Sequence, residues 1–171
     1  MNTSFNPLPP GYTHVQHTFE PVFDEHSRIL ILGSFPSVKS REIQFYYGHP
    51  QNRFWKLMAQ LLEVPVPQSI DEKKTMLLTH GLALWDVITS CDIKGSSDSS
   101  IKNAVPADIS RILKAANIQT IIANGGTAFR LYRRYCEPVT GRPAALCPST
   151  SPANAAFSLE RLSECWSKFI I

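Results

Sequence analysis

Short apolar runs alternate with polar loops along most of the chain. The runs at 28–32, 118–123 and 143–147 are rich in aliphatic and β-branched residues. Such runs are typical of strands that are buried on both faces of a sheet. The apolar run at 82–87 predicts a further short strand or turn. Each of the first two runs ends abruptly in a loop that contains glycine, which marks the end of a strand.

Between these runs, apolar residues recur every three or four positions, which indicates helices packed by one face. One helix is expected to begin near residue 52 or 53 and to end before Pro65. Another begins at Ser69, which forms a capping box with Glu72, and it ends at Gly81. Three more helices are predicted over 106–116, through Phe129, Tyr132 and Tyr135, and through Leu159, Leu162, Trp166 and Phe169.

The alternation of strands and helices predicts an α/β protein with right-handed crossovers. We expect a three-layer α/β/α sandwich around a central, mostly parallel four-stranded sheet, in one domain over 1–171. Residues 1–21 form a proline-rich lead-in that wraps the surface, and 91–104 is too rich in Gly and Ser to be regular. Three strand-end loops converge at one sheet edge, where ligands bind in open α/β sheets.

Composition narrows the class of protein only a little. The 171 residues are 43% hydrophobic and 18% charged, with a net charge of +3 that is compatible with a polyanionic partner. Four cysteines lie far apart without zinc-ligand spacing, so we expect reduced, mostly buried thiols and no metal. Neither a signal peptide nor an 18-residue apolar run occurs. We therefore expect a cytoplasmic monomer without cofactor or membrane contact.

The common catalytic motifs are missing from the chain. No nucleophile elbow, Walker lysine, HExxH motif, dinucleotide fingerprint or pair of carboxylates is found. The loops instead offer Ser, Thr, Asn, Gly and aromatic residues. Such uncharged loops suit hydrogen bonding to, and stacking on, a neutral heterocycle.

The segment 46–52 offers several candidates, each with two interpretations. Tyr46 and Tyr47 either provide a ring on which a base stacks or cover the edge of the sheet. His49 either shapes the entry to the helix or donates to a leaving group or phosphate. Asn52 is either the N-cap of the helix or an amide whose oxygen holds a water for attack.

The later loops carry the same ambiguity. Asn124 follows a strand and precedes two glycines, so it serves either a turn or hydrogen bonding to a base edge. Ser149, Thr150 and Ser151 are either ordinary loop hydroxyls or groups that grip phosphates without reading sequence.

Four segments together resemble one known family. They are GSFPS at 33–37, YYGHPQNRFW at 46–55, NGGTAF at 124–129 and CPSTSPANA at 147–155. This set resembles the uracil-DNA glycosylase superfamily, most closely its hypoxanthine-DNA glycosylase branch, over roughly residue 28 to the C-terminus. The HPxNRFW segment is also similar to the mismatch-specific uracil/thymine glycosylases.

The resemblance implies roles for particular residues. The mismatch-specific enzymes carry a catalytic Asn just before the proline of the first loop, where this chain has Phe35. The hypoxanthine branch lacks that residue too, and its catalytic Asn within HPxNxFW corresponds to Asn52. By the same matching, Tyr47 stacks on the extruded base, and the PSTSPANA loop contacts the minor groove.

These observations lead to the hypothesis of a monofunctional DNA repair glycosylase that flips a deaminated base, hypoxanthine or also uracil or xanthine, out of damaged DNA. Asn52 is expected to position the water and His49 to assist it, with no metal and no cofactor. Base-binding candidates are Gly33, Ser34, Phe35, Tyr47 and Asn124. DNA-contact candidates are Ser37, Lys39, Ser149, Thr150, Ser151, Pro152, Ala153 and Asn154, with Arg53, Arg130, Arg133 and Arg142 further out.

Two alternatives belong to other classes. Phe35 at the catalytic position of the first loop favours a catalytically silent binder of damaged or mismatched DNA on the same scaffold. Hydrolysis of free nucleosides is disfavoured, because no cluster of carboxylates is evident for the ribose hydroxyls.

Overall fold

The computed structural model describes residues 7–170, and four parallel strands form its central sheet. These strands are β2 (Ile29–Gly33), β3 (Leu82–Asp86), β6 (Thr120–Asn124) and β7 (Ala145–Cys147), in the order β3-β2-β6-β7. The predicted four-stranded parallel sheet is therefore confirmed. All four carboxyl ends point to the same edge, as parallel pairing requires.

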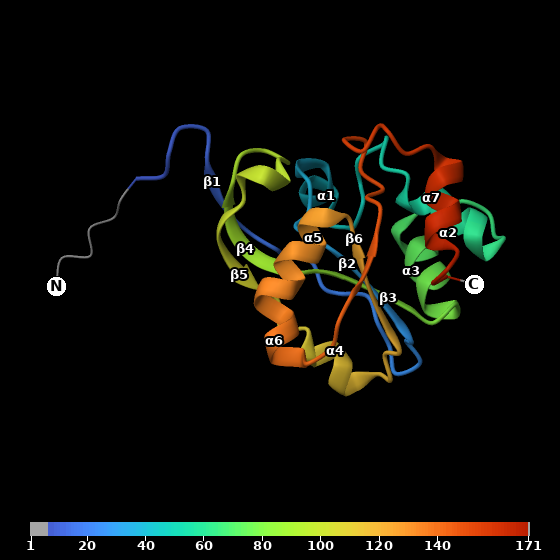
Figure 1. Ribbon diagram of the computed structural model, residues 1–171. Helices are drawn as coiled ribbons and strands as arrows, with labels where there is room; N and C mark the ends of the chain where they lie inside the picture. The colour runs from blue at the N-terminus through green and yellow to red at the C-terminus, as the bar shows by residue number, and fades with distance from the viewer. Residues whose placement is uncertain (1–6, 171) are drawn as a thin grey trace.

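Helices cover both faces of this sheet (Figure 1). On one side lie α2 (Phe54–Leu62), α3 (Ile70–Thr79) and α7 (Leu159–Trp166). On the other side, α5 (Gly126–Leu131), a π-helical turn η2 (Tyr132–Cys136) and α6 (Glu137–Thr140) follow one another without a break. The short helix α4 (Ser110–Ala115) leads into β6. The three-layer arrangement agrees with the prediction.

The predicted helix boundaries hold to within a few residues, because local capping sets them. Ser69 accepts a hydrogen bond from the backbone N–H of Glu72, as the capping box requires. The α2 helix starts at Phe54 and ends at Leu62, where Glu63 takes a left-handed conformation before Pro65. The helix expected over 106–116 is shorter, spanning only Ser110–Ala115.

A second sheet was not predicted. It is antiparallel, with the order β1-β4-β5, and consists of β1 (Thr13–Gln16), β4 (Ile88–Ile93) and β5 (Lys102–Pro106). The prediction that 91–104 is irregular was therefore wrong, since this segment holds the end of β4, a 3₁₀ turn η1 (Asp98–Ser100) and most of β5. Long-range pairing with β1 and β5 stabilises β4 although its sequence is polar.

Two segments taken as loops also contain regular structure. The lead-in contributes β1, although its residues 1–6 lie outside the described part of the chain. The long loop after β2 contains α1 (Val38–Ile43), which is capped by the hydroxyl of Ser37. The lead-in therefore does more than wrap the surface.

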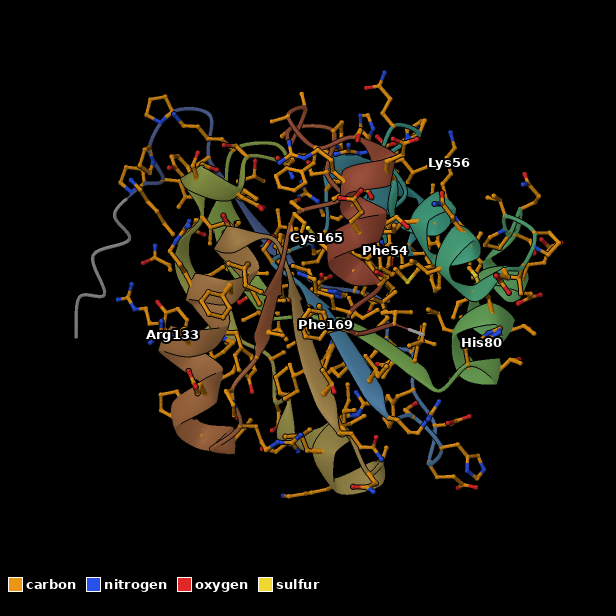
Figure 2. All side chains as sticks on the ribbon, turned by 45° about the vertical axis from the view of Figure 1, so that its right-hand side comes forward. Phe54, Lys56, His80, Arg133, Cys165 and Phe169 are labelled. Carbon is orange, nitrogen blue, oxygen red and sulfur yellow. The ribbon has the colours of Figure 1, made fainter. Side chains whose placement is uncertain are left out.

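One continuous core lies between the sheet and the helices. Leu30, Ile31 and Leu32 of β2 are fully buried, and they belong to the same core cluster as residues of α2, α7 and η2. Phe54 and Trp166 are fully buried where α2 meets α7. Figure 2 labels Phe54 at this position. The burial of Phe54 and Trp55 shows that both side chains serve packing. Over residues 7–170, no helix is long and apolar enough to cross a membrane.

The indole of Trp166 links this core to the loop before α7, because its Nε1 donates to the carbonyl oxygen of Pro148 at 3.0 Å. Replacing Trp166 with Phe leaves that carbonyl without its donor, so we expect the free energy of unfolding to fall by about 1–3 kcal/mol. Urea denaturation measures the change. The exposed Val139→Ala is the control and should stay within about 0.5 kcal/mol of the parent protein. Equal stability of the Trp166 variant and the control would contradict the expectation.

Candidate functional site

A large cleft of about 1100 Å³ lies at the carboxyl edge of the central sheet. The three predicted strand-end loops line it, through residues 33–37, 124–127 and 146–154. A fourth segment, residues 96–99 before β5, adds a wall that the sequence did not indicate. The volume is slightly above the usual range for small-molecule sites, so the cleft has room for one nucleotide.

The floor of the cleft is formed where β2 and β3 end side by side, since Gly33 pairs with Asp86. A Cβ on Gly33 would lie 2.3 Å from Oδ1 of Asp86 and 3.1 Å from the hydroxyl oxygen of Tyr47. Any residue with a side chain would therefore displace the carboxylate. Asn124 ends β6, on the other side of β2.

Asp86 is buried at this floor and is held by a residue from the N-terminal segment. Its Oδ2 lies 2.8 Å from Nε2 of His17, and the two side chains are only 5% and 2% exposed. The ring of His17 is itself packed against Phe19, with centroids 4.3 Å apart. The interpretation of the site as uncharged was therefore wrong, because a buried carboxylate lines it.

Tyr47 adopts an uncommon conformation above the floor. Its φ of 52° is in the left-handed region, which is rare for a residue with a bulky side chain and is characteristic of functional sites. Its ring stacks on Phe54 at a centroid distance of 4.2 Å, so α2 supports the ring from behind. Among residues 7–170, the Tyr47 hydroxyl is the one buried side-chain polar atom without a hydrogen-bond partner. Burial, together with the negative charge of Asp86, raises the pKa of Tyr47, so the hydroxyl is protonated.

Tyr46 lies in a different environment from Tyr47. It is 2% exposed, and its hydroxyl donates to the carbonyl oxygen of Glu20. Its own carbonyl oxygen accepts a hydrogen bond from Nε1 of Trp55. Tyr46 therefore belongs to the core, whereas Tyr47 is available to a ligand.

Asn52 lies on the wall of the cleft, at the centre of a fixed network. Its Oδ1 accepts from the backbone N–H of Phe54 at 3.0 Å and from the hydroxyl of Thr150 at 2.9 Å. The backbone N–H of Phe54 can only donate, so the amide atom that faces it must be the oxygen. Both lone pairs of Oδ1 are thus occupied. This corrects the expectation that the oxygen holds a water, and leaves the Nδ2 group as the free donor.

Asn124 is tied to the same network through Thr150. Its Nδ2 donates to the Thr150 hydroxyl and its Oδ1 accepts from the Thr150 backbone N–H, both at 3.0 Å. Thr150 is fully buried, so it cannot contact a phosphate as expected, and it instead connects the two asparagines. Asn124 borders the cleft beside it.

The loop after β7 is shaped by its own hydrogen bonds and by Arg53. The two terminal guanidinium nitrogens of Arg53 donate to loop carbonyls, Nη2 to Ser151 (2.9 Å) and Asn154 (3.0 Å) and Nη1 to Phe157. Arg53 therefore holds the loop and is not free to attract DNA, contrary to the expectation. Ser149 and Ser151 accept from backbone N–H groups of the loop, while their hydroxyls line the cleft, as do Pro152 and Ala153.

The first loop and the rim also differ in part from expectation. Phe35 is 7% exposed and packs edge-on against His17, although it borders the cleft. Ser34 donates to Asp98 at 2.9 Å, which ties the first loop to the η1 wall. Ser37 caps α1 and lines the cleft, whereas Lys39 is outside the cleft lining and pairs with Glu42.

His49 is exposed at the rim and lines the cleft, where its Nδ1 accepts from the backbone N–H of Gln51. The more distant arginines lie elsewhere. Arg130 donates to Thr127 of the cleft wall, whereas Arg133 pairs with Glu137 along the helical segment η2–α6. Figure 2 places Arg133 on the side of the sheet away from α2 and α7. Arg142 donates to the carbonyl of Ile118, before β6 and away from the cleft edge, so its outer electrostatic role is not supported.

Sequence reasoning missed three residues of the site, His17, Asp86 and Asp98. Asp86 follows an apolar run directly, just as Asn124 does, and this signal could have identified it. Nothing in the sequence pairs His17 with a residue 69 positions away. Within residues 7–170, no three His, Cys, Asp or Glu side chains are grouped closely enough to hold a metal ion.

Comparison with known proteins agrees with this geometry. The model of the uracil DNA glycosylase superfamily matches residues 20–170. The chain belongs to this superfamily. A hypoxanthine DNA glycosylase of Methanosarcina acetivorans is 34% identical over 151 residues, 88% of this chain and 95% of the relative. Another of Methanosarcina barkeri is 38% identical over 111 residues, 63% and 69% of the two chains.

A solved structure of a relative has the same fold as this superfamily member. The solution NMR structure of a candidate uracil DNA glycosylase from Methanosarcina acetivorans superposes with a TM-score of 0.76 at 34% identity. The match covers 89% of this chain and 94% of that protein. The fold and family inferred from the four segments are therefore confirmed.

The clamp formed by Arg53 leads to a prediction about loop order. In Arg53→Ala, the carbonyls of residues 151–157 lose their shared donor, so amide hydrogens of this loop should exchange about tenfold faster or more, which is over 1.4 kcal/mol of local stability. Hydrogen exchange followed by mass spectrometry measures this. The α3 segment is the internal reference and should exchange at an unchanged rate. Uniform acceleration throughout the protein would indicate global destabilisation and contradict a local clamp.

The close approach at Gly33 leads to a second prediction. Gly33→Ala places a methyl group against the Asp86 carboxylate, so we expect the melting temperature to fall by several degrees, equivalent to about 1–3 kcal/mol. Gly126→Ala is a matched control for stability, because its Cβ would meet only the guanidinium of Arg130 at 3.5 Å. Equal melting temperatures for the two variants would show that the floor has more room than the structure indicates.

Proposed function

We propose that the protein is a monofunctional DNA glycosylase that releases hypoxanthine from DNA. One observation supports this most directly: Tyr47, Asn52 and Asn124 meet in one cleft at the sheet edge of a uracil DNA glycosylase superfamily member. Two relatives of the chain are named hypoxanthine DNA glycosylases, which supports the choice of base. We take the enzyme to act as a monomer in the cytoplasm.

The deaminated base leaves the duplex and enters the cleft over Gly33. There Tyr47, whose ring is backed by Phe54, presents its hydroxyl edge to the base, in place of the stacking that the resemblance implies. Extrusion costs least for a poorly paired base, so the mispair itself assists selection. The hydroxyls of Ser149 and Ser151 line the cleft and donate to oxygens of the flanking phosphates, while Ser37, whose hydroxyl already donates to Ser40, lies near the same phosphates at the rim.

Hydrolysis then breaks the bond between C1′ of the sugar and the base, whose nitrogen keeps the electron pair. A water oxygen bonds to C1′, its proton passes to solvent, and the departing base takes up a proton. Asn52 holds this water by donating from Nδ2, since Oδ1 is already occupied. Because Phe54 and Thr150 fix the amide, the donor is oriented before the substrate arrives.

Two substitutions at Asn52 separate catalysis from its structural hydrogen bonds with Phe54 and Thr150. Asn52→Asp keeps an oxygen for Phe54 and Thr150 but lacks the Nδ2 donor, so the protein should fold while release of hypoxanthine falls by about 10²–10³-fold. Asn52→Ala should lose the same activity and also about 1 kcal/mol of stability. Release is measured by single-turnover cleavage of an inosine-containing duplex followed by alkali. The exposed Asn117→Ala serves as the control and should be fully active. Normal turnover by Asn52→Asp would remove Asn52 from catalysis.

The second candidate function is a silent binder of damaged DNA. Phe35, packed against His17 where the mismatch-specific relatives carry a catalytic Asn, favours it. The same assay decides between the two functions, because an enzyme yields alkali-labile strand breaks. A binder retards the duplex in a gel without producing them.

A further inference from the structure

Two polar side-chain atoms that the mechanism above does not use lie close to one point at the floor of the cleft. Oδ1 of Asp86 and the hydroxyl of Tyr47 both lie within 3.1 Å of the same point above the Cα of Gly33. Asp86 has His17 at its other oxygen, whereas the buried Tyr47 hydroxyl has no partner. Buried polar groups are nearly always hydrogen-bonded, so an unpaired hydroxyl on the lining of a cleft is a donor available to a ligand.

We propose that Asp86 and Tyr47 select bases that carry a ring N–H beside a carbonyl, and that His17 is the residue that positions Asp86. This inference deepens the proposed glycosylase function and rests on it. The carboxylate accepts from the ring N–H, and the Tyr47 hydroxyl donates to the carbonyl oxygen. Together they match the N1–H and O6 of hypoxanthine.

The same pair rejects the base from which hypoxanthine arises. Adenine has a lone pair at N1, which faces the Asp86 carboxylate, and an amino group at position 6, which faces the hydroxyl hydrogen of Tyr47. The contact at N1 becomes repulsive and leaves the buried carboxylate without its partner, whereas the Tyr47 hydroxyl can turn to accept from the amino group. Asp86 therefore carries most of the discrimination against adenine. Uracil and xanthine carry the accepted edge, whereas cytosine does not. Guanine and thymine also carry it, and their stable pairing in the duplex protects them.

His17 fixes the orientation of the Asp86 carboxylate. Its Nε2 holds Oδ2 of Asp86 at 2.8 Å, so Oδ1 is left directed over Gly33 toward the cleft. His17 precedes the segment that matches the superfamily, which starts at residue 20. The strand β1 pairs with β4 and thereby brings His17 to the floor. The N-terminal segment thus completes the site.

The test compares hypoxanthine with N1-methylhypoxanthine in otherwise identical duplexes, under single-turnover conditions. The parent protein should release hypoxanthine at least about 100-fold faster, because the methyl group removes the N1–H and meets the carboxylate. In Asp86→Ala, release of hypoxanthine should fall about 100-fold and the preference over the methylated base should shrink to about threefold or less. An unchanged preference in this variant would overturn the inference.

Further variants cover the case in which Asp86→Ala does not fold. Tyr47→Phe keeps the ring on Phe54 but lacks the donor, so its preference for hypoxanthine over unsubstituted purine, which has no O6, should fall about tenfold. His17→Phe keeps the packing and should lose the preference for N1–H, whereas His17→Gln, which retains a donor, should restore it. Unchanged preferences in Tyr47→Phe and His17→Phe would likewise overturn the inference.

The same experiments distinguish a failure of the proposed glycosylase function from a failure of this inference. If the parent protein releases no base from any duplex, the glycosylase proposal fails and this inference fails with it. If the parent protein is active but the variants lose activity equally on all bases, only the base-reading role is wrong. Circular dichroism confirms that each variant is folded before its preference is measured.

Discussion

The structure depends on the close approach of two parallel strands at their carboxyl ends, where Gly33 of β2 lies beside Asp86 of β3. Because Gly33 has no side chain, the carboxylate and the Tyr47 hydroxyl can occupy the space above its Cα. A polar floor inside an apolar sheet is costly unless each group is paired. His17 pairs one side of Asp86, and the remaining atoms are left for a ligand.

The walls around this floor are fixed by side chains that do not reach the substrate. Arg53 binds the carbonyls of the loop after β7, and the indole of Trp166 binds Pro148 at the start of that loop. Thr150 joins Asn52 to Asn124 across 98 and 26 residues of sequence. The site is therefore organised before DNA arrives, which lowers the ordering cost on binding and favours catalysis by fixed dipoles.

Much of this architecture could be predicted from sequence, because its signals are local. The apolar runs indicated three of the central strands, and the run at 82–87, interpreted as a strand or a turn, forms the fourth. The capping box indicated the start of α3. The β1-β4-β5 sheet escaped prediction because its strands are short and polar and are stabilised by distant pairing. Asn52 and Tyr47 were found through the HPxNxFW resemblance, whereas Thr150 and Arg53 were misread, since burial and clamping depend on contacts about a hundred residues apart. Neither the bound oxygen of Asn52 nor the His17–Asp86 pair leaves a pattern in the chain.

The central claim is that an extruded base is received over Gly33, between the Tyr47 ring and the ends of β3 and β6. The most direct measurement is a crystal structure with a duplex that contains 2′-fluoro-2′-deoxyinosine, whose glycosidic bond resists cleavage. This account predicts the hypoxanthine ring in the cleft, against Tyr47 and within hydrogen-bonding distance of Asp86. A base that remains stacked in the duplex, or that is seated outside the cleft, would contradict it.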